Sequence, residues 1–136
     1  MIESRSMTGV DTNVLARFFA KDDLDQFAKA RDFLGSLSSL SPGFVSMVCL
    51  IELIWVLRGK YRASKNELMA CVEKLLNSSE LILESETAVT QALDRFASSK
   101  SDFADCLIER CGFLAGCKET VTFDRDAARY AGMRLL

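Results

Sequence analysis

Short apolar runs alternate along the chain with stretches in which apolar residues recur every three or four positions. The short runs predict β-strands, and the longer spacing predicts amphipathic helices. The predicted strands are residues 7–10, 44–45, 81–83, 120–123 and, as a possible edge strand, 133–136. The predicted helices are residues 14–19, 24–37, 47–58, 64–76, 85–96, 102–114 and 124–130. Because strands alternate with helices and lack an in–out polar pattern, we expect an α/β domain with a mainly parallel sheet covered on both faces.

Polar residues mark the points at which two of these helices begin. Asp23 with Gln26, and Ser64 with Glu67, have the spacing of an N-cap residue and the third residue of a helix. The most apolar helix, residues 47–58, is expected to be the central one.

The composition indicates one folded domain. The chain has 136 residues, of which 49% are hydrophobic and 26% charged, so it has enough apolar surface for a single core. It contains no histidine, which excludes catalysis by a Ser-His-Asp or Cys-His arrangement and a zinc site built on imidazole. Any chemistry must therefore rest on carboxylates, hydroxyls, thiols or cations.

The cysteines and the first residues bear on location. The five cysteines are odd in number, form no C-x-x-C pair and mostly lie among apolar residues, which indicates reduced core thiols. The first residues lack the layout of a signal peptide, and the longest apolar stretch, residues 44–57, is too short to span a bilayer. We therefore expect a cytoplasmic protein with no membrane anchor. The net charge of −2 argues against a broad surface for nucleic acid but leaves room for a local basic patch.

Acidic residues lie at or near the ends of the predicted strands. Asp11 closes the first strand and Asp124 closes the fourth, while Asp102 and Asp105 lie at the start of the helix before that fourth strand. Ligands of parallel sheets bind outside the carboxyl ends of the strands. Asp102 and Asp105 are three residues apart, so their carboxylates face one side of a helix and can converge on one ion. The sequence therefore predicts an acidic site at one edge of the sheet.

Glu52 is the only charged residue between Met47 and Leu57. Because no rotation of this helix provides a polar face, the Glu52 carboxylate is expected to be buried or to face a cleft. An isolated ionised carboxylate in an apolar setting costs of the order of several kcal/mol unless a cation compensates. That cation would be a metal ion or, as a purely structural alternative, Arg17 or Arg58.

Each of the other acids also has a purely structural explanation. Asp102 is a natural N-cap, and the helix dipole favours Asp105 in the first turn. Asp11 can serve in a turn or cap, and Asp124 can cap the short helix that follows it. For Asp102 both explanations stay open, and Asp105 is the stronger candidate for a ligand.

Carboxylates without His or Cys partners suit a hard cation. They favour Mg²⁺ or Mn²⁺ over Zn²⁺, and such a site acts on substrates that bear phosphate. Hydrolysis of a phosphodiester is the natural reaction. A basic group beyond the central helix is a candidate for binding a nucleic-acid backbone, although a solvated helix end is the commoner meaning of such a run. It consists of Arg58, Lys60, Arg62 and Lys65.

Three stretches, with a helical Glu between the first two, resemble the PIN-domain ribonucleases, and specifically the VapC-type toxins of bacterial type II toxin–antitoxin systems. They are residues 9–15 (Gly-Val-Asp-Thr-Asn-Val-Leu), 101–108 (Ser-Asp-Phe-Ala-Asp-Cys-Leu-Ile) and 121–126 (Val-Thr-Phe-Asp-Arg-Asp). The motifs occur in the order of the family. The resemblance implies a PIN domain at residues 7–136 with a three-layer α/β/α fold and a central, mainly parallel, short-stranded sheet. Residues 1–6 would be an N-terminal extension without an assigned function.

The resemblance also implies which residues form the site. Asp11, Glu52, Asp105 and Asp124 would be an acidic quartet around one or two Mg²⁺ or Mn²⁺ ions. Supporting residues would be Thr12, Asn13, Asp102, Thr122 and Asp126. Thr12 and Asn13 would orient Asp11. Asp102 would contribute through a water molecule, and Thr122 would supply a hydroxyl. Asp126 would either replace Asp124 or face solvent.

Partners follow from the same resemblance. The substrate would be RNA, and the chain would form a homodimer. A cognate VapB-like antitoxin would cover the acidic groove with its C-terminal segment and direct a basic side chain into it. The apolar floor of that groove would include Val14, Phe18, Phe27, Phe33 and Leu37.

Two other classes of protein stay open as alternatives. An α/β phosphatase or phosphoacceptor domain would place a further acid close to Asp11, but Asn13 stands two residues later. A catalytically inactive PIN-like binding module would be expected to have lost one of the four acids, and all four are present.

Overall fold

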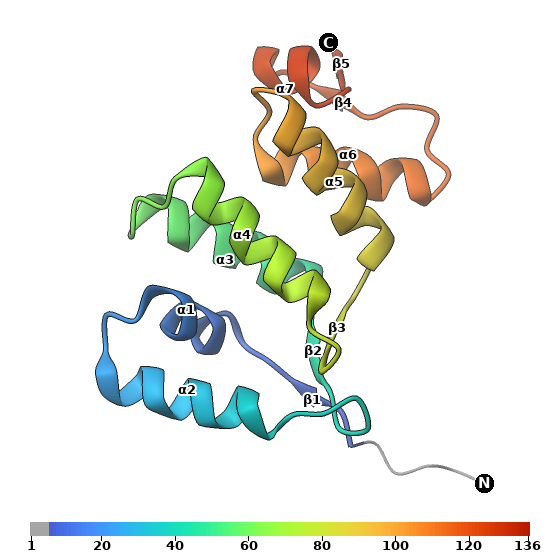
Figure 1. Ribbon diagram of the computed structural model, residues 1–136. Helices are drawn as coiled ribbons and strands as arrows, with labels where there is room; N and C mark the ends of the chain where they lie inside the picture. The colour runs from blue at the N-terminus through green and yellow to red at the C-terminus, as the bar shows by residue number, and fades with distance from the viewer. Residues whose placement is uncertain (1–5) are drawn as a thin grey trace, which may run out of the picture. The chain divides into compact units, whose positions relative to one another are not determined.

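The computed structural model describes residues 6–136, which form seven α-helices and five β-strands (Figure 1). Contacts divide the chain into two compact units. The first unit ends at Glu84 and the second covers Ser85–Leu136. Of the extension expected at residues 1–6, only Ser6 lies within the described residues, and its hydroxyl donates to the Leu40 carbonyl oxygen (2.8 Å).

The first unit contains a three-stranded parallel sheet in the order β1-β2-β3. The strands are β1 (Thr8–Gly9), β2 (Gly43–Val45) and β3 (Leu81–Leu83). The predicted parallel pairing is confirmed, although β1 is shorter than the predicted residues 7–10. A Cβ atom at Gly43 would lie 2.9 Å from Leu37 Cδ1, so only glycine lets the chain approach so closely here.

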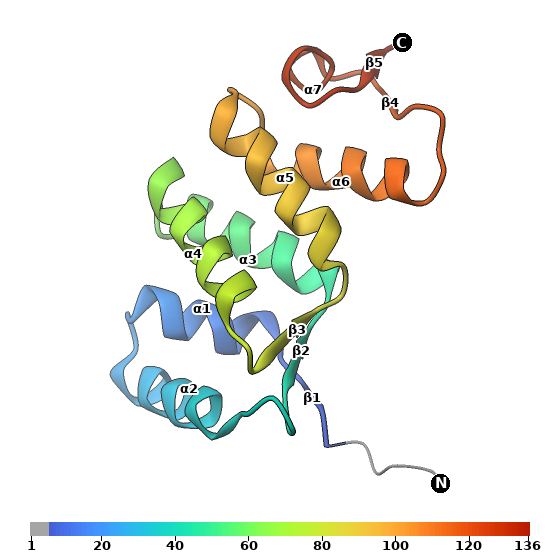
Figure 2. The ribbon, with the colours of Figure 1, turned by 45° about the vertical axis from the view of Figure 1, so that its right-hand side comes forward.

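Four helices accompany this sheet, and both views show α1 beside α2 and α3 beside α4 (Figure 2). They are α1 (Thr12–Ala20), α2 (Leu24–Ser36), α3 (Met47–Gly59) and α4 (Lys65–Asn77). The predicted cap of α2 is confirmed, because the Asp23 side chain accepts from Gln26 N (3.0 Å). Ser64 and Glu67 form the predicted capping box of α4. The core of this unit includes the buried residues Leu15, Leu50, Leu53, Ile54 and Val72.

The second unit is built from α5 (Glu86–Ser98), α6 (Phe103–Leu114) and α7 (Arg125–Tyr130), with a small parallel sheet. That sheet pairs β4 (Val121–Thr122) with β5 (Arg134–Leu135), so the possible strand predicted near the C-terminus is confirmed. Phe96 and Phe103 pack edge to face, with ring centroids 5.7 Å apart, and join α5 to α6. Leu107 and Cys106 complete the buried side of α6.

None of the five cysteines, which all lie within residues 6–136, forms a disulfide. Three of them are buried, Cys111 is half-buried and Cys117 is exposed, so the expectation of core thiols holds for most of them and is wrong for Cys117. No helix in residues 6–136 combines the length and the apolar character needed to cross a membrane.

Candidate functional site

Asp11 lies between the end of β1 and the first residue of α1. Its backbone has the extended conformation of an N-cap residue, yet its side chain accepts no hydrogen bond from the helix. In the six other helices of residues 6–136, the N-cap side chain does accept a backbone N–H. The exposed Asp11 carboxylate is therefore available to a ligand, and the capping explanation is wrong for this residue.

Thr12, the first residue of α1, connects this position to Glu52 on α3. Thr12 is only 5% exposed, and its hydroxyl donates a hydrogen bond to Glu52 Oε1. The two residues meet because α1 packs on α3. A buried hydroxyl on a packed helix restricts the orientation of the carboxylate that it contacts. The sequence indicated a role for Thr12 beside Asp11 but not this contact.

Glu52 is exposed, so of the two expectations for its carboxylate, burial is wrong, and a position that faces a cleft stays a prediction. The reason is that α3 has an uncovered face in spite of its apolar sequence. Val48 and Trp55, one turn to either side of Glu52, are 76% and 55% exposed. Arg17, one of the two cations considered as a partner for Glu52, pairs instead with Asp22 (3.1 Å).

The negative charges of Asp11 and Glu52 both affect the pKa of the Cys49 thiol. Its thiol donates to the Val10 carbonyl oxygen (3.4 Å), at the end of β1. Burial raises the pKa of the Cys49 thiol, and the charges of Asp11 and Glu52 raise it further, against a hydrogen bond with Thr12 that lowers it. Both carboxylates therefore act on the same small region of the first unit.

In the second unit, Asp102 caps α6 and accepts from Asp105 N (3.1 Å), as its structural explanation predicted. Both aspartates are half-buried. Burial raises the pKa of the neighbouring Cys106 thiol. A hydrogen bond with Ser101 and the charge of Arg95 lower this pKa, while the charges of Asp102 and Asp105 raise it. The two carboxylates thus act on one region at the start of α6.

Asp124 caps α7, and its Oδ1 accepts from Asp126 N (2.8 Å) and Ala127 N (2.9 Å). The Thr122 hydroxyl accepts from Asp124 N (3.0 Å), which orients the backbone at the end of β4. Asp124 and Asp126 are both exposed. Capping is therefore confirmed for Asp124, and an additional role as a ligand stays a prediction.

The remaining residues of the predicted site all lie at exposed positions. Asn13 stands in the first turn of α1. The basic group at the end of α3 and the start of α4 consists of Arg58, Lys60, Arg62 and Lys65. Trp55 was not among the residues predicted for the site, although it follows Glu52 by three residues and this spacing puts both on one helix face.

The predicted quartet is divided between the units. Asp11 and Glu52 belong to the first unit and Asp105 and Asp124 to the second, so the convergence of all four stays a prediction. Within either unit, the described residues contain no group of three or more His, Cys, Asp or Glu side chains placed to hold a metal ion. The donors themselves fit a hard divalent cation, because Asp11 and Glu52 offer exposed carboxylate oxygens and the Asp11 side chain accepts no hydrogen bond from its helix.

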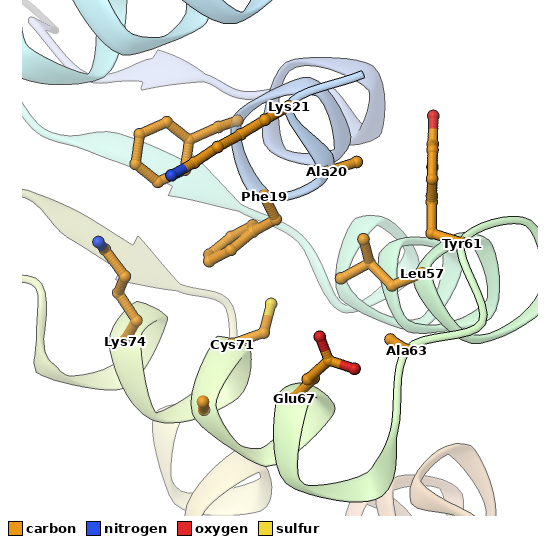
Figure 3. A pocket seen from close by; sticks show the side chains of 11 residues that line it. Phe19, Ala20, Lys21, Leu57, Tyr61, Ala63, Glu67, Cys71 and Lys74 are labelled. Carbon is orange, nitrogen blue, oxygen red and sulfur yellow. The ribbon is translucent and has the colours of Figure 1, made fainter.

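A separate cavity of about 500 Å³ opens in the first unit between the ends of α1 and α3 and the face of α4 (Figure 3). Phe19, Leu57 and Cys71 form part of its apolar lining, and Lys21 and Lys74 lie at one side of it. Burial raises the pKa of the Cys71 thiol to about 12, so this cysteine is not a nucleophile at neutral pH.

The PIN domain family model matches residues 9–133, a span that contains all four predicted acids. The chain is also similar to a protein named VapC ribonuclease from Aquifex aeolicus (strain VF5). The two are 26% identical over 117 residues, which cover 85% of this chain and 86% of the relative.

Proposed function

Because the chain belongs to the PIN-domain family, we propose that it is a VapC-like toxin, an endoribonuclease that hydrolyses RNA phosphodiester bonds with Mg²⁺ or Mn²⁺. The PIN domain is a three-layer α/β/α fold, and the helices and parallel strands of both units belong to that class. The observation that carries the proposal is the uncapped Asp11 carboxylate beside the Thr12–Glu52 pair. The name of the relative supports the reaction.

Asp11, Glu52, Asp105 and Asp124 are the residues that we propose to hold the cation. When bound, a divalent ion polarises water and offsets the charge that builds up on the phosphate in the transition state. The chain contains no histidine that could act as a general base, and we propose that the carboxylates accept the protons. Free cysteines and an RNA substrate agree with a cytoplasmic location.

Supporting residues act through these carboxylates. Thr12 restricts the orientation of Glu52 by its hydrogen bond. Thr122 holds the backbone of Asp124, and Asp102 holds the backbone of Asp105. Asn13, exposed beside Asp11, and Asp126, exposed beside Asp124, are proposed to act at the rim of the site. The group Arg58, Lys60, Arg62 and Lys65 is proposed to bind the RNA backbone.

Cleavage of RNA tests this function directly. Purified chain, freed of any partner, is incubated with a panel of transfer and messenger RNAs in the presence of Mg²⁺, Mn²⁺ or EDTA. We expect defined fragments with either metal and none with EDTA. Absence of cleavage of every RNA with both metals would exclude the function. Metal binding without cleavage would favour an inactive binding module, and retention of labelled phosphate on the protein would favour a phosphoacceptor.

A ribonuclease of this kind would damage its own cell, so we propose a VapB-like antitoxin as a partner. Its C-terminal segment would place apolar side chains on the first unit and a basic side chain at the carboxylates. The cavity between α1, α3 and α4 supports this, since Phe18 and Leu57 line it. Phe18 also stacks on Phe27 (centroids 5.9 Å), and both rings are half-buried.

A homodimer is proposed as the active form, to be tested by sedimentation.

A further inference from the structure

The exposed face of α3 is unusual for so apolar a helix. Leu50, Leu53 and Ile54 on the other side are at most 1% exposed, whereas Val48 and Trp55 are 76% and 55% exposed. These two residues share one face with Glu52, which lies between them at helical spacing. A lone exposed apolar side chain needs no explanation, but here an exposed valine and an exposed indole flank a proposed ligand carboxylate and form an apolar surface at the site. This surface is a candidate for binding part of the substrate.

Positive charge begins where this face ends. Arg58 follows Trp55 by one helical turn, and Lys60 and Arg62 follow in the turn between α3 and α4. All three are exposed, as is Lys65 at the start of α4. The Lys60 ammonium lies 5.3 Å from the centroid of the Tyr61 ring. From Glu52 through Trp55 to the turn after α3, the order is therefore carboxylate, indole, cations.

We propose that Trp55 stacks on a nucleobase of single-stranded RNA next to the phosphodiester that is cleaved, while the following phosphates reach the cations beyond it. This inference rests on the proposed function and adds a specificity-determining residue to it. Aromatic side chains that alternate with cations are the usual way of holding a single strand, because bases stack on the rings and phosphates pair with the charges.

Charge favours RNA over a protein as the occupant. The centres of protein interfaces are depleted of charged residues, but here Glu52 and Arg58 stand one turn to either side of Trp55. A nucleobase needs only the Trp55 ring for stacking, and the phosphates of the RNA strand match the positive charge at the end of the helix. If this face instead served self-association, Trp55→Ala would convert a dimer to a monomer.

The chain has a single tryptophan, so its fluorescence reports on Trp55 alone. The full chain is titrated with a short single-stranded RNA, with Ca²⁺ in place of Mg²⁺ to slow cleavage, and separately with inorganic polyphosphate. We expect saturable quenching by RNA and none by polyphosphate, which carries charge but no bases. Absence of quenching by RNA at saturation would overturn the proposal.

Variants separate stacking from a structural effect. Trp55→Ala is expected to weaken binding of a labelled oligonucleotide about tenfold, and Trp55→Phe less than threefold, roughly in proportion to stacking. Leu24→Ala is the matched control, since Leu24 is 78% exposed on α2, away from this face, and binding should not change. In cleavage assays Trp55→Ala should raise KM and leave kcat nearly unchanged. An unchanged KM, or conversion of a dimer to a monomer by Trp55→Ala, would overturn the proposal.

The two proposals fail in different ways. Wild-type chain that cleaves no RNA but keeps quenching that depends on bases would contradict the proposed ribonuclease and leave the stacking site in place. Cleavage at normal KM by Trp55→Ala would contradict the stacking site and leave the ribonuclease in place. Glu52→Gln should lose cleavage and keep quenching.

Discussion

Two aspartates at helix N-termini, Asp11 and Asp124, use their carboxylates differently. Asp124 accepts two backbone N–H groups of α7, whereas Asp11 accepts none from α1. An N-cap aspartate that does not cap gives up about 1 kcal/mol of helix stabilisation. Such a residue is typical of a site where the carboxylate has another use, and Asp11 is therefore the strongest single candidate for a ligand in this chain.

Neutral substitutions of the two acids in the first unit test this use. Asp11→Asn and Glu52→Gln are expected to abolish cleavage and to keep the fold, because loss of one of two neighbouring negative charges relieves repulsion when no metal is bound. Mn²⁺ should raise the Tm of the wild-type chain, by preferential binding to the folded state, and should raise that of the variants much less. Unfolding of either variant in EDTA would instead indicate a structural ion pair.

Substitutions of Thr12 test whether the orientation of the Glu52 carboxylate affects the rate of cleavage. Thr12→Val keeps the shape of this buried side chain but removes the hydroxyl that donates to Glu52. We expect kcat to fall about tenfold, a change of about 1.4 kcal/mol in the barrier, with a small loss of stability because the exposed Glu52 can turn to water. Thr12→Ser restores the donor and should recover most of the rate. Equal rates for the valine variant and the wild type would exclude a positioning role.

Asp102 and Asp105 are expected to differ. Asp102→Asn keeps an oxygen that can accept from Asp105 N, so α6 stays capped and cleavage should fall only moderately. Asp105→Asn removes a proposed ligand and should abolish cleavage. Rate constants with saturating Mn²⁺ check this order, with Asp94→Asn, at an exposed position of α5, as the control. The reverse order would mean that the ligand face of α6 is assigned wrongly.

At the scale of elements, one polar cluster joins the helices of the second unit. Glu109 on α6 is 8% exposed, and it accepts from Arg95 Nη1 (2.8 Å) and from Arg110 Nε (2.7 Å) and Nη2 (2.9 Å). Arg95 also donates to the Ala131 carbonyl oxygen (2.7 Å), at the end of α7. A Cβ atom at Gly132, where φ is +79°, would lie 2.5 Å from Arg95 Nη1. This cluster therefore fixes α5, α6 and α7 together.

The cluster predicts an acid-sensitive contribution to stability. The hydrogen bond with Arg110 holds the pKa of Glu109 below its ordinary value of 4.5, and the charges of Arg110 and Arg95 act in the same direction against burial. Because the folded-state pKa is the lower one, this contribution is complete above about pH 4.5 and is lost as the pH falls through the folded-state pKa. Glu109→Gln should lower the free energy of unfolding by about 2 kcal/mol at neutral pH.

Thermal unfolding of the full chain at several pH values measures this effect. The loss of Tm caused by Glu109→Gln should shrink as the solution is acidified below about pH 4.5. Glu119→Gln is the matched control, since Glu119 pairs with Arg134 at an exposed site (2.8 Å) and such pairs contribute little. An equal loss of Tm for the two variants at neutral pH would contradict the importance of the buried cluster.

At the scale of the whole molecule, the proposed toxin requires a neutralising partner. The chain is expressed in a bacterium with and without the neighbouring upstream reading frame. We expect arrest of growth by the chain alone, rescue by co-expression, and no arrest by Asp11→Asn. Equal growth in both cases, with active protein present, would contradict the toxin–antitoxin assignment and leave the nuclease chemistry in place.

Most elements of the fold were predictable because they depend on short-range patterns. The capping box at Ser64 and the parallel pairing of β2 with β3 agree with the pattern of residues. The resemblance to PIN domains agrees with the family model that matches residues 9–133. The boundaries of β1 were less accurate, since a strand of two residues is defined by its hydrogen bonds to β2 and not by its own composition.

The sequence by itself determined where the acids stand relative to strands and helices, because caps, turns and helical spacing involve residues within about four positions of one another. Only the tertiary structure decided which contacts the Asp11 and Glu52 carboxylates make and how exposed they are. Thr12 reaches Glu52 across 40 positions of the chain, a contact that exists only because α1 packs on α3. The exposed face around Trp55 has the same origin, since the packing of neighbouring elements selects which side of an apolar helix is covered.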